Sequence, residues 1–221
     1  ILANLGAVMK QSLKSDKYEK DTENAVNTVM KMFWNPGLKV LFENVNKDGS
    51  FDLESCEGRF VNPGHGLETM WFIMNYLERT GKKDMMQDAF KYVDGIFEFG
   101  WDKRYGGIFY FMDALGKPHM ELQWDMKLWW PHNEAIIAML YAYRLSGDRK
   151  FWNYFKMVDE WTWNHFPDKE YGEWFGYLNR RGEPTHMLKG GKWKTFFHVP
   201  RGLYFAIEQL KAIKAAGLPT D

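Results

Sequence analysis

The chain has 221 residues, of which 45% are hydrophobic, so it is long enough to bury a substantial core. Its 29 basic and 29 acidic residues balance, which argues against the basic surface of a nucleic-acid-binding protein. Its apolar runs are shorter than the roughly 18 residues that a membrane-spanning helix needs, so we expect no membrane partner. The single cysteine, Cys56, excludes an internal disulfide and is consistent with a reducing compartment.

The predicted elements repeat along the chain with a period of about 66 residues, which is typical of tandem structural units. The stretch "ILANLGAVMK" at residues 1–10 reads as the inside of a helix and predicts a fragment of a longer chain. The segments "GWDKRYGGIFYFMDALGKP" (100–118) and "HFPDKEYGEWFGYLNRRGEP" (165–184) align at a constant offset, as from Asp102 to Asp168. A fainter copy, "VLFENVNKDGSF", lies upstream at residues 40–51.

Each copy predicts two helices followed by a short aromatic strand pair. "GLETMWFIMNYLERTG" (66–81) and "KDMMQDAFKYVDGIFEFG" (83–100) have helical periodicity, and "GGIFYFMDALG" (106–116) reads as the strand pair, closed by a glycine turn. Gly81 and Gly147 are placed to end the first helices of two copies. Asp84 and Asp148 then stand where the second helices begin.

A unit of this size cannot bury its apolar face alone and must stack on its neighbours. Helical hairpins of this kind form an open solenoid or close into a toroid of inner and outer helices. The sequence therefore predicts an all-α fold with short β-hairpins, an (α/α)₆ barrel of which residues 1–221 supply about half as a single domain. The inner helices are expected to begin near Gly66, Pro131 and Pro200.

Three histidines occupy equivalent points of the repeat. His65, His132 and His198 each fall at the start of a predicted inner helix, beside a helix breaker in "NPGH", "WWPH" and "FHVP". In a closed toroid these starts gather on one rim of the central cavity, so we expect three imidazoles around one pocket. The alternative is that each is a helix cap or packed side chain, because a repeat can also duplicate a structural histidine.

Other polar and aromatic side chains accompany the histidines. Glu68 follows His65 by three residues, Glu134 follows His132 by two, and Arg201 follows His198 by three. Each could orient an imidazole or hold a substrate oxygen, and each could instead stabilise a helix terminus or a salt bridge. Trp129 and Trp130 precede Pro131 in "KLWWPHNEAI" and are expected to wall the cavity that grips a polar ring.

Two imidazoles that face each other across a cavity suit proton removal and return at a carbon atom, because histidine works as both acid and base near neutral pH. A base on one face and an acid on the other would invert a stereocentre next to a carbonyl. A metal site is one alternative, although its candidate ligands match no common spacing: His119, Glu121, Asp125, His132 and Glu134. Glycoside hydrolysis by paired carboxylates is another.

Residues 58–201 resemble the N-acylglucosamine 2-epimerase family, also called renin-binding protein. The matching segments are "GRFVNPGHGLETMWF", "GWDKRYGGIFYFMDALG", "ELQWDMKLWWPHNEAI", "EYGEWFGYLNRRGEP" and "KGGKWKTFFHVPR". Gln123 departs from the glutamate expected in "LEW". The resemblance implies the (α/α)₆ barrel, with residues 1–221 as its C-terminal part.

The resemblance also implies an activity, the interconversion of N-acetyl-D-glucosamine and N-acetyl-D-mannosamine without metal or chemical cofactor. It places the acid/base pair on His65 and His198 and an active-site carboxylate on Glu134, and it implies an arginine from an N-terminal half. A cytoplasmic homodimer, activated by ATP or a related nucleotide, is implied as well, and renin is a candidate partner. A cellobiose or mannose epimerase, an aldose–ketose isomerase and a protease-binding protein remain alternatives.

Overall fold

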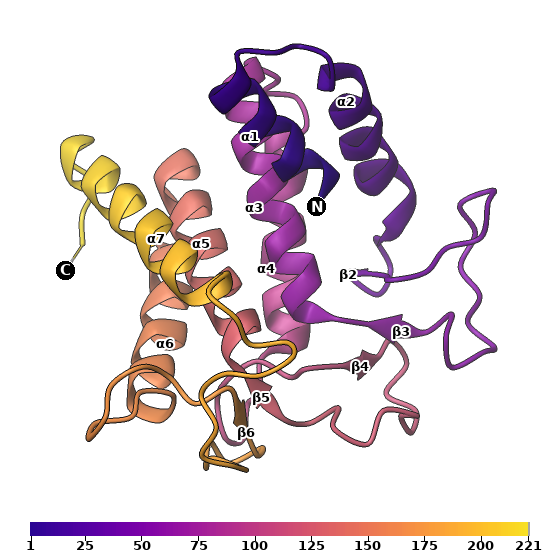
Figure 1. The fold of residues 1–221 in the computed structure, drawn as a ribbon. Coiled ribbons are helices and arrows are strands. Elements are labelled where there is room, and N and C mark those ends of the chain that lie inside the picture. Colours follow the sequence, from indigo (N-terminus) through magenta and orange to yellow (C-terminus); the bar gives the residue numbers. More distant parts are fainter. Residues whose placement is uncertain (221) are drawn as a thin grey trace.

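The computed structural model describes residues 1–220 and is dominated by helices (Figure 1). The helices are α1 (Leu2–Leu13), α2 (Glu19–Thr28), the π-helical turn η1 (Val29–Phe33), α3 (Pro63–Thr80), α4 (Met86–Gly100), α5 (Trp129–Ser146), α6 (Arg149–His165) and α7 (His198–Ala215). The short strands are β1 (Trp34–Asn35), β2 (Val40–Leu41), β3 (Phe60–Val61), β4 (Met112–Asp113), β5 (Lys127–Leu128) and β6 (Tyr177–Leu178). Among these residues, no helix has the length and apolarity of a membrane span.

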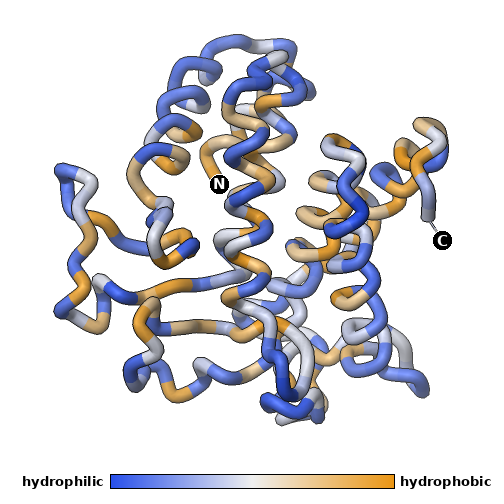
Figure 2. The backbone as a smooth tube through the Cα atoms, turned by 180° about the vertical axis from the view of Figure 1, so that it is seen from behind, coloured by the Kyte–Doolittle hydropathy of each residue, from blue (hydrophilic) through white to orange (hydrophobic). Residues whose placement is uncertain are grey.

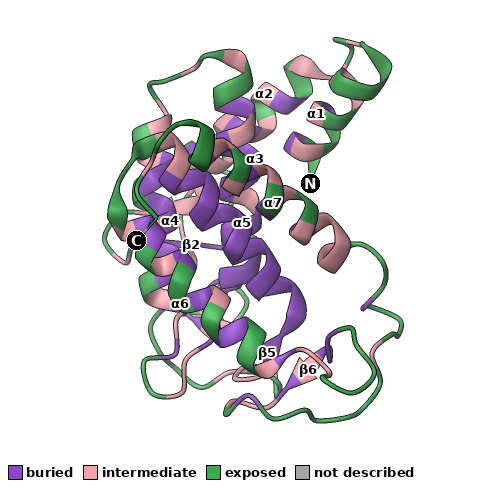
Figure 3. Ribbon diagram, turned by 90° about the vertical axis from the view of Figure 1, so that its left-hand side faces the viewer, coloured by how far each residue is buried: buried purple, intermediate pink, exposed green. Residues whose placement is uncertain are grey.

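The helices form an arc with an inner and an outer layer. Helix α5 lies between α3 and α7, while α4 packs on α3 and α6 packs on α5 from outside (Figure 1). Because α5 has neighbours on several sides, every residue from Trp129 to Tyr143 is buried (Figure 3). The predicted inner helices are α3, α5 and α7, and each begins two or three residues before the expected position.

Most of the predicted helix boundaries are confirmed. Gly81 (φ 70°) and Gly147 (φ 71°) adopt the left-handed conformation that ends α3 and α5. Asp148 caps α6 by accepting a hydrogen bond from the backbone N–H of Lys150. Asp84 has no such role, because α4 begins at Met86 without a side-chain cap. The turns that join the helices at this end are hydrophilic, shown in blue at the top of Figure 2.

The strands pair across the repeat, which differs from the expected local hairpin in residues 106–116. β3 pairs with β4 and β5 pairs with β6, each antiparallel and separated by about 50 residues. Within the local loop only an isolated bridge, Trp101 with Ile108, is formed. Each long-range pair ties the strand that leads into an inner helix to the loop that follows the next outer helix, and so fixes where α3 and α5 begin.

The two ends of the arc expose large apolar side chains. On α1, Leu2 and Leu5 are exposed, and on α7 Tyr204 and Ile207 are exposed (Figure 3). A groove of about 590 Å³ runs between α1 and α2. An arc of inner and outer helices with apolar ends has the form of an incomplete toroid.

The starts of α3 and α5 approach each other closely at Gly64. A Cβ atom there would lie 2.7 Å from the Trp130 ring and 2.9 Å from Pro131. We expect Gly64→Ala to lower the free energy of unfolding by about 1–3 kcal/mol, because the methyl group must displace a packed indole. Urea denaturation of the natural protein measures this. Gly191→Ala, at a site with no neighbour within 4 Å, is the matched control and should leave stability unchanged.

Candidate active site

The starts of the inner helices surround a cleft of about 490 Å³. His65 and His198, the first and last of the three predicted histidines, both line it. Trp130 is close to both: its ring centroid is 5.0 Å from that of His65 and 5.6 Å from that of His198. The cleft therefore has two imidazoles near one shared indole. Its lining residues are His65, Tyr110, Gln123, Met126, Leu128, Trp129, Trp130, Tyr177, Trp193 and His198.

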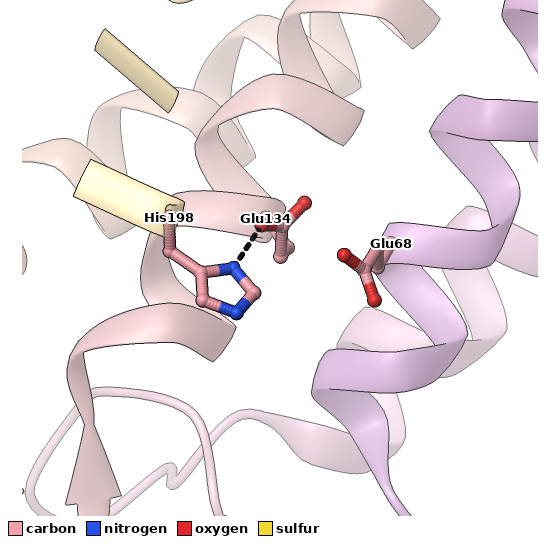
Figure 4. Close-up of side chains that lie close together, drawn as sticks. All are labelled: Glu68, Glu134 and His198. Atoms are coloured by element: carbon pink, nitrogen blue, oxygen red, sulfur yellow. Dashed lines mark hydrogen bonds and ion pairs between the residues drawn. The ribbon is translucent and has the colours of Figure 1, made fainter. Parts of the chain in front are cut away.

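His198, the first residue of α7, forms a dyad with Glu134 of α5. Its Nδ1–H donates to Glu134 Oε1 at 2.7 Å (Figure 4). Glu134 has no solvent exposure, whereas the His198 side chain is 19% exposed. Because Nδ1 is occupied by the carboxylate, Nε2 is the nitrogen left to exchange a proton with a bound molecule.

The second oxygen of Glu134 is also occupied. The indole Nε1–H of Trp71, on α3, donates to Oε2 at 2.7 Å. Arg201 donates to Oε1, the oxygen that also accepts from His198. A buried carboxylate is tolerated only when its oxygens are paired, and two helices, α3 and α7, supply the partners here. Sequence reasoning missed Trp71, because it lies 63 residues from Glu134 and no spacing marked it.

Glu68 completes the group around Arg201, which donates to Glu68 Oε1 at 3.2 Å. Burial raises the pKa of Glu68, and the neighbouring Glu134 carboxylate raises it further, while Arg201 and His198 oppose this shift. Ligand atoms of Glu68, Glu134 and His198 lie within 4.8 Å of one another, close enough to hold a cation (Figure 4). The Arg201 guanidinium already bridges the two carboxylates, however, so this group does not fit a metal.

The first histidine has a different carboxylate partner. Nδ1 of His65, on α3, donates to Oε2 of Glu43 at 2.9 Å, and the His65 side chain is half exposed. Burial alone would lower the pKa of His65, but the hydrogen bond and charge of Glu43, with a contribution from Glu68, raise it. Glu43 follows β2 in the faintest copy of the repeat, where no motif or spacing singles it out. Two imidazoles, each held through Nδ1 by a carboxylate, thus line one cleft.

The family model of N-acylglucosamine 2-epimerase (GlcNAc 2-epimerase) matches residues 7–201. The chain belongs to the N-acylglucosamine 2-epimerase family. The resemblance seen in the sequence segments is therefore confirmed.

Known members of the N-acylglucosamine 2-epimerase family match over most of this chain. The N-acylglucosamine 2-epimerase of Rattus norvegicus is 43% identical over 200 residues, which are 90% of this chain and 47% of that protein. The enzyme of that name from Homo sapiens is 43% identical over 182 residues, 82% of this chain and 42% of that protein. The chain thus spans about half the length of the curated relatives it matches.

A solved structure confirms the fold. The cellobiose 2-epimerase from Bacillus thermoamylovorans B4167 superposes with a TM-score of 0.74 at 21% identity, covering 95% of this chain and 50% of that one. At this identity the match concerns the fold alone. The predicted (α/α)₆ architecture, present as a partial toroid, is confirmed for this member of the epimerase family.

His132 does not face the cleft, so its expected contact with substrate is wrong. It has no solvent exposure, its Nδ1–H donates to the Leu128 carbonyl at 2.7 Å, and its Nε2 accepts from the Ile108 N–H at 3.0 Å. The ring stacks on Trp161 of α6, on the outer side of α5. Burial lowers the pKa of His132 to about 3, so it stays neutral. The metal-ligand set that contained His132 is not brought together either, and His119 stacks on Trp124 instead.

The aromatic wall and the strand below it are held by a buried charge cluster. Trp129 and Trp130 both line the cleft, and their contact with substrate stays a prediction. Just before them, fully buried Lys127 donates to Asp102 Oδ2 at 3.3 Å, and Arg180 donates to the same oxygen at 2.7 Å. Burial lowers the pKa of Lys127 to about 8. Burial would raise the pKa of Asp102, but Arg180 and Lys127 lower it to about 2.

The His65–Glu43 contact predicts a measurable titration change. Glu43→Gln removes the negative charge that favours imidazolium, so we expect the pKa of His65 to fall and its titration to move to lower pH. NMR titration of the histidine ring signals in the natural protein measures this. The exposed pair Lys211–Glu208 offers a control, because Glu208→Gln removes an acidic charge away from the cleft. An unchanged His65 titration in Glu43→Gln would contradict the assignment.

Proposed function

We propose that this protein interconverts N-acetyl-D-glucosamine and N-acetyl-D-mannosamine by moving the C2 proton between His65 and His198. The observation that carries the proposal is the pair of imidazoles on one cleft, each with Nδ1 held by a carboxylate and each against Trp130. The names of the relatives support the substrate class, since two relatives that are 43% identical over 90% and 82% of this chain are named N-acylglucosamine 2-epimerase.

The chemistry follows from the positions of the two rings. With the sugar open to its aldehyde, one imidazole takes the C2 proton, and the C–H bonding electrons move into the enolate formed with the C1 carbonyl. The other imidazolium then donates a proton to the opposite face of C2, which inverts the stereocentre. One ring has gained a proton and the other has lost one. Half-exposed His65 exchanges protons with water, which helps to restore the starting state.

The remaining polar groups would position the substrate and stabilise charge. Arg201 is bound to Glu68 and Glu134, and its Nη2 lies 3.4 Å from Nδ1 of His198, so its positive charge is suited to stabilise the enolate oxygen. Trp129 and Trp130 offer flat apolar surfaces for the sugar chain. No chemical cofactor enters this scheme.

The proposal extends to the whole protein. Residues 1–221 would form the C-terminal part of one barrel domain, and the exposed apolar faces of α1 and α7 support further helices packing there. Family membership supports a cytoplasmic homodimer that ATP or a related nucleotide activates. Binding to renin or a similar protease would be a separate property, because it requires neither histidine.

A cellobiose or mannose epimerase, or an aldose–ketose isomerase, is the competing function. The structural similarity to a cellobiose 2-epimerase favours it, since the same two histidines could serve. Product analysis with N-acetylglucosamine, glucose, mannose and cellobiose separates these activities. Conversion of N-acetylglucosamine to N-acetylmannosamine as the fastest reaction is the expected result, and a preference for cellobiose would overturn the substrate assignment.

Removal of either histidine tests the mechanism. We expect His65→Ala and His198→Ala each to lower kcat by about 10²–10⁴-fold, because each removes one acid/base group. Deuterium incorporation at C2, followed by NMR in D₂O with the natural protein, measures the loss. His186→Ala, an exposed histidine outside the dyads, is the control and should stay active. Near wild-type exchange in either cleft variant would exclude the two-histidine mechanism.

A further inference from the structure

We propose that Trp71 is a positioning residue for the reaction: its indole N–H fixes Glu134 so that this carboxylate holds the His198 imidazole. The inference rests on the proposed function, in which His198 transfers a proton. Trp71 touches neither the cleft nor the reacting carbon and acts through Glu134.

The contacts around Glu134 give Trp71 this role. Its two oxygens have different partners among residues 1–220: Oε2 accepts only from Trp71, at 2.7 Å, whereas Oε1 accepts from both His198 and Arg201. Trp71 is 1% exposed and Glu134 is fully buried, so water cannot replace the indole donor. The orientation of the carboxylate therefore depends on the indole N–H.

Arg201 provides the competing arrangement. Arginine and a carboxylate prefer a two-point pair in which two N–H groups meet the two oxygens. Here Arg201 reaches Glu134 through Nη2 alone, and its buried Nε and Nη1 have no hydrogen-bond partner in the part of the chain that the structure describes. If Oε2 were free, the carboxylate could turn to form the two-point pair and draw Oε1 away from His198. Trp71 occupies Oε2 and so prevents this rotation.

The indole itself is held in place on several sides. The Trp71 ring lies 4.2 Å from Phe72, 5.3 Å from Phe205 and 5.9 Å from Tyr141, measured between centroids. The Arg201 guanidinium lies 5.4 Å from the same ring. Trp71 thus contacts Glu134 through its N–H and Arg201 through the face of its ring.

The test is Trp71→Phe in the natural protein, which keeps an aromatic ring and removes the N–H. We expect kcat to fall about tenfold to a hundredfold while KM changes little, because a displaced imidazole affects proton transfer more than binding. Trp152→Phe is the matched control: Trp152 is also buried, at 6% exposure, but its Nε1 has no partner. Equal effects of the two substitutions would overturn the proposal.

A spectroscopic measurement distinguishes positioning from a general loss of stability. ¹⁵N NMR of the ring nitrogens shows which nitrogen of His198 carries the proton. In the wild type we expect the proton on Nδ1, and in Trp71→Phe a mixture of both neutral forms, with His65 unchanged. A His198 signal identical to wild type would contradict the inference.

A double substitution tests the competition with Arg201. Lysine cannot form the two-point pair, so Trp71→Phe should lower kcat by a smaller factor in an Arg201→Lys background than in the wild type. Equal factors in the two backgrounds would exclude the proposed competition. If Trp71→Phe does not fold, β-(3-benzothienyl)alanine at position 71 keeps the shape of the indole and replaces only the N–H by sulfur; wild-type kcat in that protein would overturn the proposal.

Failure of the inference and failure of the proposed function give different results. A wild-type protein without epimerase activity would reject the function, and the NMR comparison of His198 would still decide the role of Trp71. An active wild type whose Trp71→Phe and Trp152→Phe variants are equally active would reject the inference alone.

Discussion

The structure around the cleft depends on one buried carboxylate, that of Glu134. It has no contact with solvent, so its charge must be balanced by protein groups, and these come from Trp71 on α3 and from His198 and Arg201 on α7. Since Glu134 itself is on α5, the group forms only when all three inner helices pack together. The same packing that buries the hydrophobic core therefore assembles the candidate site.

The two imidazoles of the cleft are held in unequal surroundings. His198 is anchored by a fully buried carboxylate that also neutralises Arg201, whereas His65 is half exposed and is anchored by partly exposed Glu43. A two-sided proton transfer needs one ring in each protonation state at the start of a turnover. The two rings thus differ in solvent exposure and in the partners of the carboxylates that hold them.

Much of the fold followed from the repeat. The inner helix starts, the left-handed glycines after α3 and α5, and the partial toroid agree with the prediction. The errors concern contacts made across the repeat: the strands pair with partners about 50 residues away, and His132 turns to the outer layer, where backbone groups and Trp161 satisfy it. The repeat predicts that a side chain lies near a helix start. Its position around the helix axis, however, determines whether it points to the cleft or to the outer helices.

The sequence by itself determined the helical repeat, the incomplete toroid and the candidate set of His65, His198 and Glu134, because periodic apolar residues and long family-like segments are local properties of the chain. Only the tertiary structure showed which of the three histidines line the cleft. It also showed that Glu43 binds His65 and that Trp71 binds Glu134. Those two residues lie 22 and 63 positions from the groups they bind. Hydrogen bonds between residues so far apart in the sequence form only when the helices pack, so no local sequence pattern could predict them.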